Sequence, residues 1–265
     1  MDLGIKGKTA LITGGSGGMG REVARVLLGE GANIILSDLK QSDVDDAVKE
    51  LGDERVTGCA ADLTAKDGFD DLAAHVEERG GADILVHGAG ITGAKGDPLE
   101  MTDEDYEEAW QIDFMSAVRL SRKVVPHMVE KGWGRVVFVT SENAVQPYPD
   151  EAVYNAAKAA LLNFTKAVSL PYSEKGVLFN AVSPAFIETP MTDGMMEKRS
   201  EQLGVSKEEA IESFLKEERP FLKIGRRGKV EEVAPVIALL CSARASFVAG
   251  SAYRVDGGSV GAMNI

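Results

Sequence analysis

The stretch Lys8-Thr-Ala-Leu-Ile-Thr13, followed directly by Gly14-Gly-Ser-Gly-Gly-Met-Gly20, carries the clearest fold signal in the chain. Its first part is an apolar run of strand length, and residues 21–29 after the glycines have an amphipathic helical pattern. A glycine loop between a strand and a helix lets a pyrophosphate approach the amides at the helix N-terminus. The alternative, a flexible surface turn, is weak because both flanking elements lie so close. The stretch therefore predicts a dinucleotide-binding βα unit.

Working outward from this unit, apolar runs of strand length alternate with helical patterns along the chain. The predicted strands are residues 33–38, 55–60, 83–86, 135–141, 177–182 and 252–255. The predicted helices cover about 41–51, 64–79, 103–131, 151–174 and 231–240, and we expect Pro126 to kink the long one at 103–131. This order predicts a single α/β domain over residues 1–265, with about seven parallel strands and helices on both faces. Ligands of such sheets bind beyond the carboxyl ends of the strands.

Three further motifs fall at those strand ends. Asp38 follows Gly20 by 18 residues, close to the spacing of an acid that binds the adenosine ribose hydroxyls. Its carboxylate would repel a 2′-phosphate, so NAD is predicted in preference to NADP. Asp62 either reads the adenine edge or caps the helix expected to begin near Thr64. His87 lies in a glycine-rich loop that ends at Gly90, and we expect it to have a structural role.

The composition of the chain limits which kinds of molecule it is expected to bind and where it is expected to be found. The chain has 265 residues, 44% of them hydrophobic, and a net charge of −13, which argues against nucleic acid or an anionic membrane as partner. Cys59 and Cys241 form no CxxC pair and are expected to be buried thiols in a reducing compartment. No apolar run resembles a signal peptide or approaches the length of a membrane span. We expect a soluble, cytoplasmic protein, and we predict no bound metal.

The candidate chemistry lies in Tyr154-Asn-Ala-Ala-Lys158. Residues four apart lie on the same helix face, so the phenol and the ammonium would emerge side by side. A nearby cation favours the phenolate and lowers its pKa toward the range of general acid–base catalysis. Ser141 ends an apolar run 13 residues upstream and is placed to bind a substrate oxygen. A bare YxxxK is a weak signal by itself, and the rest of the chain gives it weight.

Together these motifs resemble the short-chain dehydrogenase/reductase family over essentially the whole chain. Thr13 to Gly20 is similar to the family's TGxxxGxG, and the His87-Gly-Ala-Gly90 segment to its NNAG. Ser141, Tyr154 and Lys158 match its catalytic serine and YxxxK. Further matches are Asp62-Leu63, the segment from Asn180 to Thr189, and the terminal Asp256-Gly257-Gly258.

The resemblance implies a Rossmann fold and NAD(P)-linked interconversion of a secondary alcohol and a ketone. The catalytic residues it implies are Ser141, Tyr154, Lys158 and Asp113. The cofactor-binding residues are expected to be Gly14, Ser16, Gly18, Met19, Gly20, Asp38, Leu39, Asp62, Leu63, Ala89, Gly90, Tyr154, Lys158, Pro184, Ala185, Ile187 and Thr189. It also suggests a homotetramer (or a homodimer) with the helices near 103–131 and 152–174 at an interface.

Three residues depart from the family pattern. Asp113 stands where many members have a catalytic Asn, Gly88 replaces the second Asn of NNAG, and Ala185 replaces the Gly of a PG pair. An Asn that acts through its backbone carbonyl is replaceable by Asp113. We further hypothesise that the Asp113 carboxylate lies near Lys158, while the alternative is that it points away and caps local backbone. The Ala185 methyl is expected to narrow the nicotinamide pocket.

The substrate residues are expected to be mostly apolar, namely Ala144, Tyr148, Phe186, Met191 and Met195. This favours a hydrophobic carbonyl compound or a 3-oxoacyl substrate, although a methionine-rich surface accepts many shapes. Residues at about 190–221 are charged, contain methionines and have helical patterns, and we expect a substrate lid rather than a plain surface insertion. A dinucleotide-sensing binding protein on the same fold is the non-catalytic alternative, and the Ser–Tyr–Lys set weighs against it.

Overall fold

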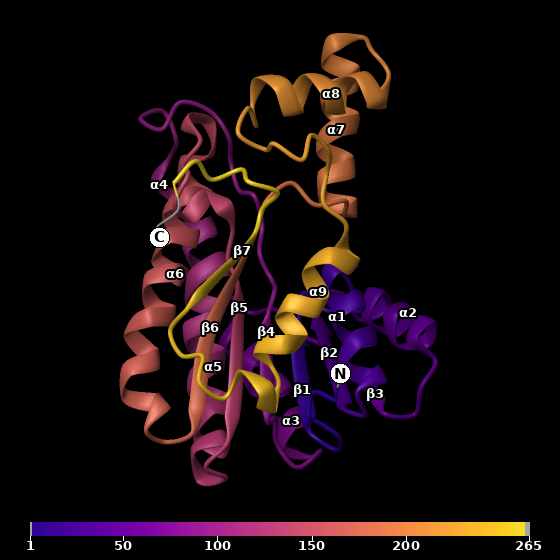
Figure 1. Cartoon of the computed structure of the whole chain (residues 1–265), viewed down its shortest axis with the longest axis vertical. Helices are drawn as coiled ribbons and strands as arrows, with labels where there is room; N and C mark the ends of the chain where they lie inside the picture. Colours follow the sequence, from indigo (N-terminus) through magenta and orange to yellow (C-terminus); the bar gives the residue numbers. More distant parts are fainter. Residues whose placement is uncertain (1, 263–265) are drawn as a thin grey trace.

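The computed structural model describes residues 2–262 and contains one seven-stranded parallel sheet in the order β3-β2-β1-β4-β5-β6-β7. Helices cover both of its faces (Figure 1), which confirms the predicted fold class. The strands are β1 Thr9–Thr13, β2 Asn33–Asp38, β3 Val56–Ala60, β4 Ile84–His87, β5 Gly134–Val139, β6 Val177–Pro184 and β7 Ala252–Val255. The α-helices are α1 Gly18–Gly29, α2 Gln41–Leu51, α3 Lys66–Glu77, α4 Asp103–Ala109, α5 Ser116–Glu130, α6 Ala152–Ser173, α7 Pro190–Leu203, α8 Lys207–Glu217 and α9 Val230–Leu240.

Two apolar layers hold the helices against the sheet. Alternate strand residues point to opposite faces, so Ala10 and Ile12 of β1 pack toward α1 and α9, whereas Leu11 packs toward α3 and α5. Strands buried on both faces form nearly continuous apolar runs, as in Ile84-Leu-Val86. Because every crossover places a helix between parallel strands, all carboxyl strand ends lie at one edge of the sheet, where the site is expected.

Helices α7 and α8 stand apart from the sheet, beyond this edge (Figure 1). They have a small core of their own, which consists of Phe186, Met196, Phe214 and Leu222. Thr189 caps α7 by accepting a hydrogen bond from the amide of Thr192, and a capping box at Ser206 opens α8. The charged segment predicted at 190–221 is therefore an ordered helical pair.

The helix predicted over 103–131 is helical from Asp103 to Glu130, but it contains a π-helical segment that the sequence did not predict. A π-helical segment, Trp110–Met115, separates α4 from α5, and Pro126 lies inside α5. A π turn accommodates an extra residue, which rotates the side chains of the segment relative to the helices on either side, and such turns are frequent at functional sites. Asp113 lies in this segment and its side chain is fully buried. Apolar periodicity does not reveal an insertion of a single residue.

Smaller differences concern the ends of elements and the cysteines. Helix α3 begins at Lys66 rather than near Thr64, and β6 extends to Pro184. Both thiols are free, and Cys241 is buried, whereas Cys59 is only half-buried. Among residues 2–262, none of the helices is long and apolar enough to span a membrane.

Candidate active site

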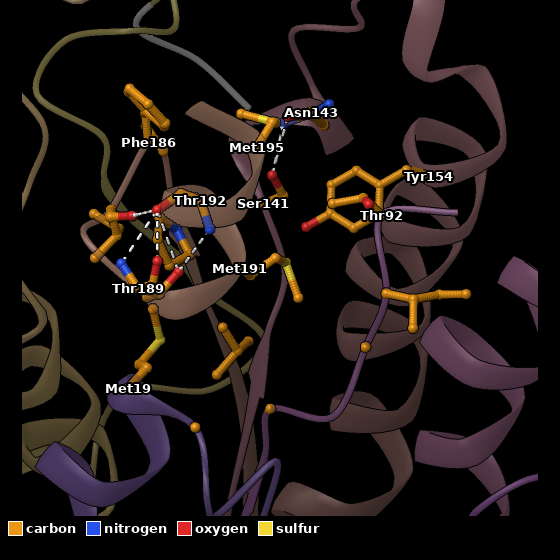
Figure 2. Close-up of a pocket in the computed structure, with 18 of the residues that line it drawn as sticks. Met19, Thr92, Ser141, Asn143, Tyr154, Phe186, Thr189, Met191, Thr192 and Met195 are labelled. Carbon is orange, nitrogen blue, oxygen red and sulfur yellow. Dashed lines mark hydrogen bonds between the residues drawn. The ribbon is translucent and has the colours of Figure 1, made fainter. Parts of the chain in front are cut away.

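A cavity of about 830 Å³ opens beyond the carboxyl ends of the strands and contains most of the predicted site residues. Its walls come from the glycine loop, the ends of β4, β5 and β6, the start of α6, and α7 with α8. Figure 2 shows Met19, Ser141, Tyr154, Phe186, Thr189, Met191 and Met195 around it. The other predicted residues that line it are Gly14, Gly18, Gly20, Gly90, Asp113, Lys158, Pro184, Ala185 and Ile187.

The glycine loop is shaped for close approach of a ligand. Gly14 has a φ of +65°, which favours glycine, and a Cβ at Gly20 would lie 2.3 Å from the carbonyl oxygen of Gly14. Helix α1 then begins at Gly18, and its N-cap residue Gly17 has no side chain to bond the first amides. These amides are thus available to an anion such as a pyrophosphate. The loop fits the dinucleotide that the sequence predicts.

Asp38 ends β2 beside this loop. Its carboxylate accepts hydrogen bonds from the amide (3.1 Å) and hydroxyl (2.6 Å) of Ser16 and from the amide of Leu39 (2.8 Å). Arg21, which the sequence analysis overlooked, donates to the carbonyl of Ser16 at 2.6 Å, but its guanidinium also pairs with Glu50. The loop therefore presents a carboxylate, and the nearby cation already has an acidic partner.

Asp62 does not line the cavity. Its carboxylate accepts hydrogen bonds from the amide (2.8 Å) and hydroxyl (2.7 Å) of Thr64 and so orders the turn before α3. The cap residue of α3 is Ala65, so Asp62 is not the cap either. Leu63 packs against the core next to α3, and Ala89 donates its amide to Thr13.

Ser141, Tyr154 and Lys158 converge in the cavity. Ser141 follows β5, and its hydroxyl and the Tyr154 phenol both face the cavity (Figure 2). The Lys158 ammonium lies 5.5 Å from the centre of the Tyr154 ring. A phenol with a hydroxyl on one side and an ammonium on the other can pass a proton to or from an oxygen placed between Ser141 and Tyr154.

Asp113 reaches this group from the π-helical segment. Its Oδ1 lies 3.2 Å from the Lys158 Nζ, and both side chains are buried. The same oxygen accepts the amide of Ile91 at 3.1 Å, while Lys158 also donates to the carbonyl of Val139 at 3.3 Å. A Cβ at Gly90 would come within 2.4 Å of the Asp113 Oδ1, so a glycine is needed there for the contact to form.

Asp113, Tyr154 and Lys158 shift one another's pKa values. Burial alone lowers the pKa of Lys158, but Asp113 and Tyr154 outweigh it and raise that pKa, so the ammonium stays charged. Burial raises the pKa of Asp113, against the pull of Lys158. Burial also raises the pKa of Tyr154; Lys158 opposes this rise, and the Asp113 carboxylate adds to it. Lys158 thus favours the phenolate as expected, but in the protein alone it does not overcome burial.

His87 is a structural residue. Its Nδ1 lies 2.9 Å from the hydroxyl of Thr13 and its Nε2 lies 3.0 Å from that of Ser116, so the ring joins β1 to α5. Burial, and then the nearby Lys158, lower its pKa to about 3. A neutral ring held by two hydroxyls agrees with the structural role expected from the sequence.

Two of the predicted substrate residues, Ala144 and Tyr148, are not among the residues that line the cavity. The Tyr148 ring instead lies under the guanidinium of Arg219, with 3.4 Å from the guanidinium carbon to the ring centre. The cavity has a set of polar lining residues that the sequence analysis missed: Lys95, Glu142, Asn143, Glu151 and Arg219. They come from four separate segments, so no local motif marks them. The one local signal for two of them was that Glu142 and Asn143 directly follow Ser141 in the sequence.

Comparisons with known proteins identify the family of this chain. The family model for short chain dehydrogenases matches residues 8–200. An uncharacterized oxidoreductase YvrD of Bacillus subtilis is 36% identical over 98% of this chain and 99% of its own. The 3-oxoacyl-[acyl-carrier-protein] reductase of Thermotoga maritima is 32% identical over 97% of this chain and 99% of its own. The structure of L-sorbose reductase from Gluconobacter frateurii, complexed with NADPH and L-sorbose, superposes with a TM-score of 0.93 at 35% identity, covering 99% of this chain and 100% of that one.

The fold and the cavity are those of a nicotinamide-dinucleotide oxidoreductase that acts on CH–OH or carbonyl groups. The chain belongs to the short-chain dehydrogenase family.

Proposed function

We propose that the protein interconverts a secondary alcohol and a ketone with NAD(H), using Ser141, Tyr154 and Lys158. The observation that carries this proposal is that these three side chains line one cavity with the glycine loop. The dinucleotide supplies or accepts the hydride at the substrate carbon. Ser141 holds the substrate oxygen, Tyr154 gives or takes its proton, and Lys158 binds the ribose and stabilises the phenolate. Asp113 holds Lys158 at 3.2 Å and acts through it.

NAD(H) is the proposed cofactor because of the charge at the adenosine end. A 2′-phosphate near Asp38 would meet a carboxylate, and the guanidinium of Arg21 is already paired with Glu50. Some relatives carry NADPH, as the L-sorbose reductase does. The preference proposed here is therefore a property of this chain's own residues, and we expect it to be at least roughly tenfold.

The helical pair α7 and α8 is proposed to be a lid over the substrate. Phe186, Met191 and Met195 line its side of the cavity and would contact the carbon skeleton. This apolar side is the part of the site that suits a hydrophobic or 3-oxoacyl carbonyl compound. The proposal includes a homotetramer with the helical segments near 103–131 and 152–174 at an interface, and Trp110 and Leu170 are exposed apolar side chains on these segments.

The test is a panel of ketones and secondary alcohols with NADH, NAD⁺, NADPH and NADP⁺, followed by the absorbance of the reduced nicotinamide. Tyr154→Phe removes only the proton-transfer group, so turnover should be abolished while NADH still binds nearly unchanged. Full turnover in this variant would refute the mechanism. NADH binding with no turnover of any substrate by the unchanged protein would favour a dinucleotide-sensing protein.

A further inference from the structure

A charged cluster forms one wall of the cavity and touches α7 at Met195. It consists of Lys95, Glu142, Asn143, Glu151 and Arg219 and is called here the polar wall. Lys95 follows β4, Glu142 and Asn143 follow β5, Glu151 precedes α6, and Arg219 follows α8. Four of the five side chains are buried, and Lys95 is partly exposed.

The polar wall is closely bonded internally. Glu151 accepts Lys95 at 2.5 Å, Asn143 at 2.5 Å and Arg219 at 3.2 Å. Arg219 also donates to Glu142 at 3.1 Å. Burying so many ionised groups is costly, and packed apolar residues often give equal or greater stability. Stability alone therefore does not explain the wall, which makes it a candidate for contact with a ligand.

The charges of the polar wall balance, with two carboxylates against an ammonium and a guanidinium. A balanced wall attracts neither an anion nor a cation strongly, since each charge is opposed at close range. What it offers a ligand is a set of hydrogen-bond donors and acceptors. The matching chemistry is a neutral polar group that both donates and accepts, and a hydroxyl does both.

Lys95 and Glu151 are the members with capacity left for a ligand. An ammonium has three N–H donors, and the second contact of Lys95 is the Met195 Sδ at 3.5 Å, which is a weak acceptor. Within residues 2–262, Lys95 is the one hydrogen-bond donor found on the Glu151 Oε1. This pair thus presents a donor and an acceptor next to each other, as a hydroxyl requires.

The distance from the reaction centre also suits a substrate. The Ser141 hydroxyl donates to the Asn143 Oδ1 at 3.1 Å, and the Nδ2 of the same amide donates to Glu151 at 2.5 Å, so a single side chain links the expected position of the substrate oxygen to Glu151. A ketone whose oxygen lies at Ser141 and Tyr154 would reach the Lys95–Glu151 pair with a hydroxyl a few carbon atoms away. An alkyl chain there would displace water from the pair without replacing its hydrogen bonds, which disfavours apolar substrates.

We propose that the Lys95–Glu151 pair, supported by Asn143 and Arg219, is a subsite for substrate hydroxyls, and that the substrate is a polyhydroxylated ketone and its polyol. This rests on the proposed alcohol–ketone reaction and deepens it, and it replaces the hydrophobic or 3-oxoacyl substrate that the apolar side of the cavity favours when taken alone. The methionine side of the cavity contacts the C–H face of such a molecule, and the polar wall contacts its hydroxyls. Lys95 is thereby a specificity-determining residue.

The experiment compares ketones of equal carbon number on the full-length protein with NADH and with NADPH. Four 2-ketohexoses (fructose, sorbose, tagatose and psicose) are measured against 2-hexanone. We expect kcat/KM for at least one ketohexose to exceed that for 2-hexanone by tenfold or more, because a site built to bond a hydroxyl rejects an analogue without it. A higher value for 2-hexanone than for every ketohexose would overturn the subsite while leaving the proposed reaction intact.

Two variants test the residues. Lys95→Met should reduce the ketohexose to 2-hexanone ratio at least tenfold, mainly by raising KM, since a binding contact is lost. Glu151→Gln should act in the same direction. Lys216→Met, the same change at an exposed position on α8, should leave the ratio as it was. An unchanged ratio in a folded Lys95→Met protein overturns the proposal, and no turnover of any ketone or polyol overturns the proposed function together with it.

Discussion

Asp113→Asn is the most informative change in this active site. The carboxylate lies 3.2 Å from the Lys158 ammonium, which in turn lies 5.5 Å from the Tyr154 ring centre, so the charge is at most about 9 Å from that centre. A unit charge at ~8 Å and an effective dielectric constant of ~20 contributes about 2 kcal/mol, or about 1.5 pKa units. Because the carboxylate disfavours the phenolate, its removal lowers the pKa of Tyr154.

The direction of the kinetic effect follows from the role of Tyr154. In alcohol oxidation the phenolate accepts the proton, so kcat/KM rises as pH increases through the pKa of Tyr154. Asp113→Asn should therefore move this rising limb to lower pH by about 1 to 1.5 units, and in any case by less than ~2 units. The falling limb of ketone reduction should move the same way, since the phenol is then the proton donor.

The measurement is kcat/KM against pH for both proteins at one ionic strength, in both directions, with the melting temperature as the check on folding. Asp103→Asn is the matched control, because it makes the same chemical change on the exposed surface of α4. A limb that stays in place in Asp113→Asn, or that moves to higher pH, would refute the electrostatic reasoning.

Three further outcomes are expected. In the unchanged protein we expect kcat/KM for NADH to exceed that for NADPH at least roughly tenfold, and Asp38→Ala should reduce this ratio. A ratio of one or less in the unchanged protein would rule out the role of Asp38. Gly90→Ala should lower kcat severely, because its methyl would fall 2.4 Å from the Asp113 Oδ1, whereas normal activity would show that the Asp113–Lys158 contact is dispensable. Phe138→Ala, in the core among Phe164 and Phe179, should cost about 3–5 kcal/mol of stability and lower the melting temperature by roughly 10 °C in a thermal unfolding scan.

The fold was predictable because its signals are local and repeated. The apolar run of β1, the glycines and the helix that follows occupy neighbouring positions, so the chemistry of the loop is readable from the sequence. The alternation of strands with helices then determines a parallel sheet, and with it the edge where Asp38, Ser141 and the glycine loop end. Tyr154 and Lys158 were readable for the same reason, since four residues along a helix fix their relative position.

Only the tertiary structure determined which other residues these side chains contact. The π turn that carries Asp113 shifts the helix by a single residue, and whether its carboxylate faced Lys158 or capped local backbone was decided by packing against Gly90 and Ile91. The polar wall is assembled from segments up to 124 positions apart, between Lys95 and Arg219, none of which carries a motif. Contacts between distant segments depend on how the sheet and α8 bring them together, so local patterns define the elements and the reaction, while packing defines the pocket that selects the substrate.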